Sequence, residues 1–222
     1  LNAVVRELVM MLTHYGVKTI YGCKGGYKGL VTPEKWVVLT PDSVREIHKL
    51  GGSVLVSDRG NPPHSEIAKN LKAMNVKQYF VLGGDGTHKG GMETFDAMQE
   101  LEEGPYECAV VGVPKTIDND VPMMDQTFGF DTACTEALRA VESAYVEAIS
   151  NANCIGLVKL MGRHCGHITM NAAIAASCVD ICLLPEMEID LQKVLEHTET
   201  LMAAKGHVVI VVAEGCGDTI VS

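Results

Sequence analysis

The segment Gln78–Thr87, "QYFVLGGDGT", joins an apolar run to a cluster of glycines. Residues 78–84 are predicted to form a buried β-strand, because apolar and aromatic side chains of this kind favour the interior of a sheet. A helix-like pattern follows over residues 89–103. A strand that leads through glycines into a helix is typical of the units that build parallel sheets. The segment therefore predicts an α/β fold.

The rest of the chain repeats this alternation of short apolar runs and helical patterns. Further strands are predicted at 18–22, 108–113, 155–160, 180–185 and 207–215, and further helices at 2–14, 64–75, 130–151, 166–178 and 190–205. The pattern favours parallel sheets flanked by helices on both faces, in which ligands bind beyond the carboxyl ends of the strands. Four polar or glycine-rich segments fall at such ends: "GGDGTHKGG", "PKTIDND", "MGRHCGH" and "EGCGD".

The composition narrows the classes of partner. The 222 residues carry a formal net charge of -10, and no basic stripe interleaved with aromatics is present, so no nucleic-acid partner is expected. No apolar run approaches the roughly 20 residues of a membrane span, and no signal peptide opens the sequence. The eight cysteines form no CxxC pair and are expected to be reduced, mostly buried thiols of a cytosol-like compartment rather than zinc ligands.

The "GGDGT" segment at 83–87 has the residue types of a phosphate site. Gly83, Gly84 and Gly86 are expected to adopt positive φ and to let a phosphate approach the backbone. The N–H groups at the start of the following helix would bind the anion, and Asp85 is a natural Mg²⁺ ligand. A simple Gly-Asp-Gly turn is the alternative interpretation.

The "PKTIDND" segment at 114–120 has the residue types of an acceptor site. One carboxylate, Asp118 or Asp120, can accept a proton from an attacking hydroxyl while the other stays with a metal or the acceptor. Thr116 can hydrogen-bond a phosphate, and Lys115 can balance its charge. An Asx-rich turn is the alternative. For the nearby His164–Cys165–His167 group, local packing or a substrate contact is preferred to a metal site, because no third ligand is evident.

The strings "GGDGT", "PKTIDND", "FGFDTA" and "MGR", in this order and at this spacing, resemble the 6-phosphofructokinase family along the whole chain. The resemblance implies transfer of the γ-phosphoryl group of ATP to the 1-hydroxyl of fructose 6-phosphate, with Mg²⁺ as cofactor. It implies a Rossmann-like, donor-binding α/β domain over residues 1–128 and a sugar-phosphate-binding α/β domain over residues 129–222. The active site would lie in the cleft between them, and homo-oligomers are usual in the family.

The site residues that the resemblance implies fall into two groups. Asp118 matches the general base, Arg163 lies near the transferring phosphoryl group, and Glu214 matches a carboxylate that binds sugar hydroxyls. The complete acceptor set is Thr116, Asp118, Asp120, Met161, Gly162, Arg163 and Glu214. Asp85 matches the Mg²⁺ site, and Arg59 matches an arginine on the donor phosphates. The complete donor set is Arg59, Gly84, Asp85, Gly86, Thr87, Lys89, Gly90 and Lys115.

The phosphoryl donor depends on the residue after Asp85. In the family a glycine there leaves room for the α-phosphate of a nucleotide, whereas an aspartate obstructs and repels it. Gly86 therefore favours ATP. Lys115 is found in pyrophosphate-dependent members but also in the ATP-dependent plant and trypanosome-type branches. Its combination with Gly86, Lys89 and "VKLMGR" resembles those ATP-dependent branches, and pyrophosphate remains the alternative donor.

The chain is expected to be a piece of a longer protein. It begins with Leu1 in the middle of a helical pattern, and the family's first glycine-rich loop and last basic segment are not in it. The piece by itself is therefore expected to be inactive, and a cytoplasmic location is expected with a plastid left open.

Two further alternatives stay open. A non-catalytic regulatory subunit of the same fold is disfavoured by the retention of Asp85, Asp118, Asp120 and Arg163. An NAD or lipid kinase, which would share "GGDGT", is disfavoured by "PKTIDND" and "MGR".

Overall fold

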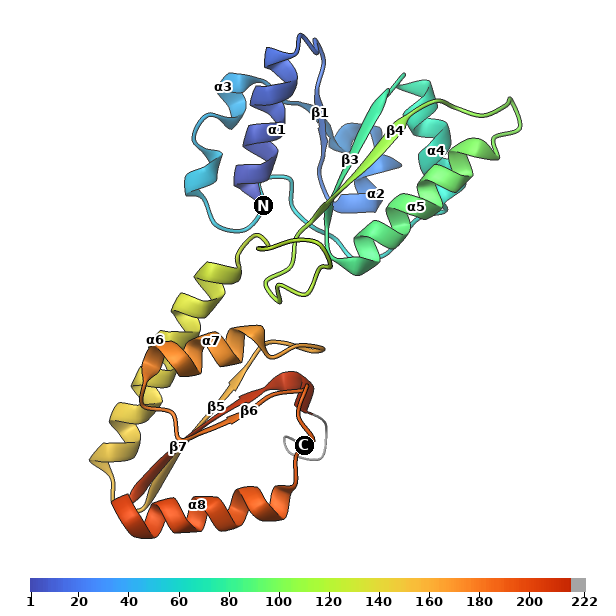
Figure 1. Ribbon diagram of the computed structural model, residues 1–222. Coiled ribbons are helices and arrows are strands. Elements are labelled where there is room, and N and C mark those ends of the chain that lie inside the picture. Colours follow the sequence, from blue (N-terminus) through green and yellow to red (C-terminus); the bar gives the residue numbers. More distant parts are fainter. Residues whose placement is uncertain (217–222) are drawn as a thin grey trace. The chain divides into compact units, whose positions relative to one another are not determined.

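The computed structural model describes residues 1–216 and divides the chain into two compact units, Leu1–Lys115 and Thr116–Ser222 (Figure 1). The two domains were expected to meet near residues 128 and 129, whereas these compact units meet at Lys115 and Thr116. The reason is that the segment after Lys115 belongs to the second unit, where Ile117 packs against the core. The last two residues of the predicted "EGCGD" strand end, Gly217 and Asp218, lie outside the described residues.

The first unit contains a parallel strand pair and an antiparallel one. Strands β3 and β4 run parallel, from Gln78 beside Ala109 to Gly83 beside Pro114, whereas β1 and β2 run antiparallel. The elements are α1 (Asn2–His14), β1 (Tyr21–Cys23), α2 (Gly26–Leu30), η1 (Pro33–Lys35), β2 (Trp36–Val38), α3 (Pro41–Val44), η2 (Ile47–Lys49), α4 (His64–Ala73), β3 (Gln78–Gly83), α5 (Asp85–Gln99) and β4 (Ala109–Pro114). The short strand β2 was not predicted. Its antiparallel pairing with β1 departs from the expectation that the sheets are parallel.

Two hydrophobic clusters hold the first unit together. Around β3, the side chains of Ile67, Leu71, Val81 and Met98 are buried between strand and helices. In the second cluster, Val5 and Val9 lie one helical turn apart on α1 and pack against α3 and η2. The β3–β4 pair thus rests on a closed core, so the chain that leaves its carboxyl end starts from a fixed position.

The second unit is a three-stranded parallel sheet with helices on both faces (Figure 1). Its elements are α6 (Phe130–Ser150), β5 (Cys154–Leu160), α7 (His167–Ala176), β6 (Ile181–Leu183), α8 (Leu191–Lys205), β7 (His207–Ala213) and η3 (Glu214–Cys216). Strand β7 lies in the middle of the order β5-β7-β6. Its Val209 and Val211 face α6 and α7, while Val208 and Val212 face α8. The predicted parallel sheet flanked by helices is confirmed for this unit, although Ile155 and Leu157 on the edge strand β5 remain exposed.

The strand registers bring the polar segments together in pairs. In the first unit Gly83 lies beside Pro114, so the segments after β3 and β4 start from the same edge. In the second unit Leu160 lies beside Ala213, so the segments after β5 and β7 do the same. Neighbouring parallel strands always present their carboxyl ends together, which is why such edges carry ligand sites.

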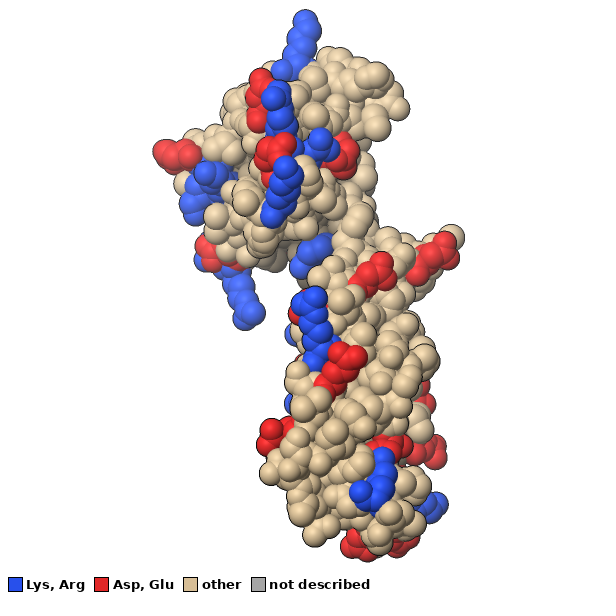
Figure 2. All heavy atoms as spheres, turned by 90° about the vertical axis from the view of Figure 1, so that its left-hand side faces the viewer, with Lys and Arg blue, Asp and Glu red and all other residues tan. Residues whose placement is uncertain are grey.

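The surface and the cysteines add two observations. Figure 2 shows Lys and Arg side chains interspersed with Asp and Glu on the face turned to the viewer, rather than gathered into one cationic stripe. Within residues 1–216, no helix has the length and apolarity to cross a membrane. All eight cysteines are free thiols; Cys108 and Cys165 are buried and the other six are partly buried, fewer buried thiols than predicted. Burial raises the pKa of the Cys23 thiol to about 12.

Candidate functional site

The "GGDGT" segment is mostly helix rather than loop. Helix α5 begins at Asp85, four residues earlier than predicted, and Gly84 is its N-cap residue with φ -87° and ψ -166°. The expected positive φ at Gly83, Gly84 and Gly86 is wrong, since none of the three adopts it. Gly83 is needed for space instead, because a Cβ atom there would lie 2.5 Å from Thr87 Oγ1. The glycines thus let the first turn of α5 close directly onto the end of β3.

The start of α5 offers the groups that an anion and its cation need. Asp85 is exposed in the first turn of this 15-residue helix, and its side chain makes no hydrogen bond or ion pair with residues 1–216. Helix N-termini attract phosphate through free N–H groups and the helix dipole. Asp85 therefore remains available for a cation that a bound phosphate would bring with it.

Gly86 and Gly90 differ in their surroundings. No atom lies within 4 Å of the place where a Cβ at Gly86 would stand, so space is open there. At Gly90 a Cβ would meet the ring of Tyr27 at 2.8 Å, and the Tyr27 hydroxyl donates a hydrogen bond of 2.5 Å to Thr87 O. Gly90 is thus covered by α2 within its own unit, whereas Gly86 is free for a ligand. Of the two glycines, only Gly86 has open space beside it in which a phosphoryl donor could lie.

The other predicted donor residues lie nearby in the first unit. Lys89 and Lys115 are exposed, and Lys115 N donates to Gly83 O at 2.7 Å, which fixes its backbone beside "GGDGT". Arg59 is exposed in the loop before α4. The neighbouring Asp58 accepts hydrogen bonds from Lys28 Nζ at 3.1 Å and from Arg59 N at 2.7 Å, and the Lys28 ammonium lowers the pKa of its carboxyl. Helix α2 contacts both this loop and the start of α5, because Lys28 pairs with Asp58 and Tyr27 donates to Thr87 O.

Sequence reasoning missed Tyr27 and Lys28 as parts of this site. They lie in "GYKGL", a segment that carries no chemical motif of its own. Their contribution is visible only through contacts with Thr87 and Asp58, which are far from them in the sequence.

In the second unit, several hydrogen bonds fix the backbone that carries Asp118. Its N–H donates to Thr116 Oγ1 at 3.1 Å. The next residue, Asn119, has a φ of 58°, a left-handed conformation that asparagine tolerates better than most residues. Its Oδ1 accepts a hydrogen bond of 2.8 Å from Thr127 N. The loop between the two aspartates is therefore a defined structure rather than an unconstrained turn.

The surroundings of the Asp118 carboxyl disfavour its charged form. It is partly buried, and this burial raises its pKa. The carboxylates of Asp120 and Glu214 raise the pKa further, while Arg163 and His164 act in the opposite direction. A raised pKa makes a carboxylate a stronger base, which is the property that general-base catalysis requires.

The segment after β5 closes against the segment after β7. Gly162 has a φ of 133°, and a Cβ there would collide with Cys165 O. Its N–H approaches Glu214 Oε1 at 3.5 Å, and Arg163 Nε lies 3.8 Å from the same oxygen. Gly215 N donates to Gly162 O at 2.9 Å. The structure thus brings Gly162, Arg163 and Glu214 together as predicted.

The remaining members of the acceptor set lie in the same unit. Met161 and Arg163 have exposed side chains, and Asp120 is exposed beside Asp118. Thr116 has already been described as the acceptor for Asp118 N. Exposed groups of opposite charge around a partly buried carboxylate suit a polar, phosphorylated ligand.

Two side chains that the motifs did not include also contact this loop. Cys165 Sγ donates to Asp118 O at 3.1 Å. His167 Nδ1 lies 3.0 Å from Asn119 O and 3.3 Å from Asp118 O. These contacts agree with local packing rather than metal binding, and residues 1–216 contain no group of three or more His, Cys, Asp or Glu that could hold an ion.

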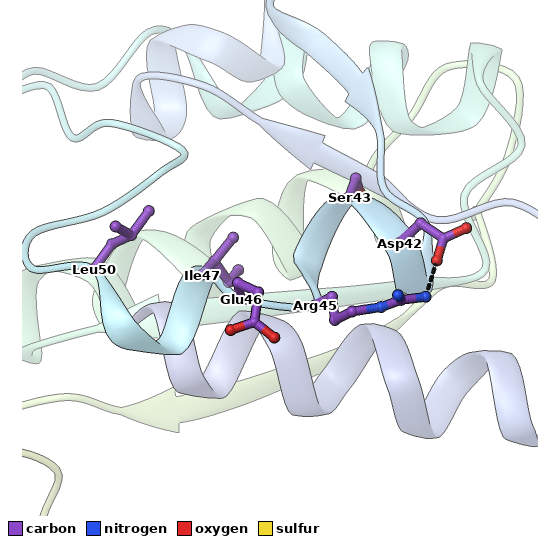
Figure 3. A pocket seen from close by; sticks show the side chains of 6 residues that line it. All are labelled: Asp42, Ser43, Arg45, Glu46, Ile47 and Leu50. Carbon is purple, nitrogen blue, oxygen red and sulfur yellow. Dashed lines mark hydrogen bonds and ion pairs between the residues drawn. The ribbon is translucent and has the colours of Figure 1, made fainter.

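A hollow in the surface lies elsewhere, in the first unit (Figure 3). It measures about 500 Å³ and is lined by Asp42, Ser43, Arg45, Glu46, Ile47 and Leu50. All six residues come from one short segment, and Arg45 is paired with Asp42. A ligand site normally draws polar groups from several elements, so this hollow is not a candidate.

The comparisons with known proteins agree with this arrangement of motifs. The family model for phosphofructokinase matches residues 1–221. The chain belongs to the phosphofructokinase family. It is 44% identical over 221 residues to ATP-dependent 6-phosphofructokinase 7 of Arabidopsis thaliana, covering 98% of this chain and 45% of that protein. It is 42% identical over 229 residues to ATP-dependent 6-phosphofructokinase of Borreliella burgdorferi, covering 97% and 50%.

Solved phosphofructokinases have the same fold. Pichia pastoris phosphofructokinase in the T-state matches with a TM-score of 0.84 and 26% identity, over 98% of this chain and 25% of that one. A pyrophosphate-dependent phosphofructokinase from Marinobacter aquaeolei matches with a TM-score of 0.80 over 96% and 57%. Its 21% identity shows a shared fold alone. The chain spans about half the length of the phosphofructokinases that it matches in sequence.

Proposed function

We propose that the protein containing this chain is an ATP-dependent 6-phosphofructokinase, which transfers the γ-phosphoryl group of ATP to the 1-hydroxyl of fructose 6-phosphate. The observation that carries the proposal is the Asp118 carboxyl, which is partly buried, has a raised pKa and lies within the influence of Arg163 and Glu214. The names of the relatives at 42–47% identity support the same reaction.

In the proposed reaction each acceptor residue has one task. Asp118 takes the proton from the attacking hydroxyl, which its raised pKa favours. Arg163 stabilises the negative charge of the transferring phosphoryl group, and Glu214 binds sugar hydroxyls. Asp120, Thr116, Met161 and Gly162 complete the sugar-phosphate site. Phosphoryl transfer depends mainly on positioning and on charge neutralisation. One base and one cation, each held by a well-ordered backbone, therefore suffice on the acceptor side of the site.

Mg²⁺ is the proposed cofactor, and the residues present fit it. Mg²⁺ in such enzymes is bound by one or two carboxylates together with substrate phosphates and water. Asp85, exposed at the start of α5 and without a partner among residues 1–216, would hold it. The bound ion would neutralise charge on the donor phosphates. Lys89, Lys115, Arg59 and the first turn of α5 from Gly84 to Thr87 would bind those phosphates.

ATP is the proposed donor because of the open space at Gly86. A test compares the full-length wild-type protein with Gly86→Asp and, as a matched control, Gly86→Ala. Since no atom lies within 4 Å of the new Cβ position, neither substitution disturbs the fold. We expect Gly86→Asp to weaken turnover with ATP far more than with pyrophosphate, and Gly86→Ala to have a small effect. Faster wild-type turnover with pyrophosphate than with ATP would refute the choice of donor.

A non-catalytic regulatory subunit is the second candidate. It would retain the fold but lack the base or the metal ligand, whereas this chain retains both Asp118 and Asp85. Absence of fructose 6-phosphate phosphorylation by the full-length protein with Mg²⁺ and either donor would favour that candidate. We further propose a homo-oligomer in the cytoplasm; one relative at 47% identity is named as chloroplastic, so a plastid is the alternative compartment.

A further inference from the structure

A histidine at the start of α7 forms hydrogen bonds with the loop that carries the proposed base. His167, the first residue of α7, directs Nδ1 at two backbone carbonyls, Asn119 O at 3.0 Å and Asp118 O at 3.3 Å. A carbonyl oxygen can only accept a hydrogen bond, so Nδ1 must carry the proton. In the neutral ring, Nε2 is then the unprotonated nitrogen. The chemistry of the contact therefore assigns one tautomer to His167.

This loop needs external support for two reasons. Asn119 adopts a φ of 58°, which is less favourable for a non-glycine residue than an extended or helical conformation. The carboxylates of Asp120 and Glu214 also disfavour the charged form of the Asp118 carboxyl. Both effects favour a rearranged backbone in which the carboxylates move apart.

The two carbonyl groups of the loop accept hydrogen bonds from the segment Cys165–His167 at the start of α7. The Asp118 N–H is bound by Thr116 Oγ1, and the Asn119 side chain is bound by Thr127 N. The Asp118 and Asn119 carbonyls accept from His167, and Cys165 Sγ adds a weaker bond to Asp118 O. Helix α7 is packed on the core through Ile168 and Ala172, so the imidazole is attached to a rigid element.

We propose that His167 is a positioning residue for the phosphoryl-transfer reaction: its Nδ1–H group holds the Asp118 and Asn119 carbonyls and so keeps the Asp118 carboxylate aimed at the acceptor hydroxyl. This inference rests on the proposed function. His167 makes no contact with substrate in this proposal. Its role differs from packing because it depends on one N–H group rather than on the volume of the ring.

The kinetic test uses two substitutions in the full-length protein. His167→Phe fills the space of the ring but has no N–H donor, whereas His167→Asn supplies an amide N–H close to the place of Nδ1. We expect His167→Phe to lower kcat about 10- to 100-fold, as misplacement of a reacting group does, while KM for ATP changes less than about twofold. His167→Asn should restore most of the loss.

Matched controls and a spectroscopic measurement complete the test. The same two substitutions at His197, which is exposed on α8, should leave kcat unchanged. The ¹⁵N chemical shifts of the His167 ring in the wild-type protein should identify the Nδ1–H tautomer, independently of any activity.

Each other outcome would count against the inference in its own way. A protonated Nε2 with a bare Nδ1 would overturn it even in a fully active enzyme, and so would a kcat of His167→Phe equal to that of wild type. An equal loss in His167→Phe and His167→Asn would indicate packing and would likewise overturn it. The wild-type protein could instead show the expected tautomer but no phosphorylation of fructose 6-phosphate. That result would support the hydrogen bonds of His167 but refute both the proposed function and the positioning role of His167 in it.

Discussion

At the scale of single residues, the surroundings of Asp118 give its carboxyl the property that the proposed general base requires. Burial and the neighbouring carboxylates of Asp120 and Glu214 raise its pKa, and Arg163 and His164 limit that rise. The sequence predicted Asp118 as the base because "PKTIDND" resembles a known motif, but it contains no information about the pKa. That property depends on Glu214 and Arg163, which lie far along the chain.

The first prediction concerns the rate of the reaction. Asp118→Asn keeps the shape of the side chain but removes the base, so we expect kcat to fall about 10²- to 10⁴-fold. The Michaelis constant for ATP should change little, because Asp118 belongs to the acceptor side. Steady-state kinetics of the full-length protein would measure both. Asp96→Asn, an exposed substitution on α5, is the control and should behave like wild type. An unchanged kcat in Asp118→Asn would refute the mechanism.

The second prediction concerns stability and pH. Because the pKa of Asp118 is raised in the folded protein, the folded state binds this proton more tightly than the unfolded state. Ionisation of Asp118 as pH rises through its folded pKa therefore lowers the free energy of unfolding. We expect Asp118→Asn to unfold at a higher temperature than wild type at pH 7.5, with the difference shrinking as pH falls towards the ordinary aspartate pKa of about 3.9. Thermal unfolding at several pH values would measure it, and a variant less stable than wild type at pH 7.5 would contradict it.

At the scale of elements, the strands and helices around the motifs were largely predictable, and their details were not. The runs at β3, β4, β5 and β7 are long and apolar, so their positions agree with the sequence pattern to within two residues. Strand β2 was missed because three residues are too few to give a periodic signal. Helix α2 was missed because "GYKGL" has two glycines in five residues, which disfavours a helix locally.

The start of α5 could not be predicted for a physical reason. Glycines are poor helix formers, so "GGDGT" indicates a loop when the sequence is considered alone. In the structure the helix begins at Asp85 because the first turn packs against the end of β3, where Gly83 leaves room for Thr87. Tertiary packing thus overrides the local preference, and the proposed phosphate-binding feature is a helix terminus rather than a strained glycine loop.

The third prediction tests this packing. Gly83→Ala places a Cβ atom 2.5 Å from Thr87 Oγ1, so the first turn of α5 must shift. We expect a loss of about 1–3 kcal/mol in the free energy of unfolding, which is usual for overpacking. Urea unfolding of the full-length protein would measure it. Gly86→Ala is the control, since its Cβ meets no atom within 4 Å, and it should be close to wild type. Equal stability of the two variants would contradict the packing argument.

At the scale of the whole molecule, the chain has a separate core in each of its two units. Ile67, Leu71 and Met98 belong to the first unit, and Val141 and Val209 belong to the second. The alternation of strands and helices along the chain predicted parallel α/β sheets, and the family resemblance implied that they form two domains. Neither could give the boundary at Lys115, since that depends on which core the side chain of Ile117 joins.

The fourth prediction follows from the separate cores. Leu71 is fully buried in the first unit, so Leu71→Ala should remove about 2–5 kcal/mol of stability there. Hydrogen exchange in the full-length protein should become faster in β3, α4 and α5, with little change in β5 and β7. The partly exposed Leu191→Ala on α8 is the control and should have a small effect everywhere. Equal acceleration in both units would show that they unfold as one.

The contact between Gly215 and the "MGR" segment limits how the proposed acceptor site could be redesigned. The Arg163 and Gly162 carbonyls occupy the place where any side chain at position 215 would begin. The cation at 163 and the carboxylate at 214 therefore stand on two segments of main chain that pack directly against each other, so moving one segment would disturb the other. A library intended to broaden the sugar that is accepted should keep 162 and 215 as glycine and diversify the exposed positions Met161 and His164, where new side chains would project into solvent.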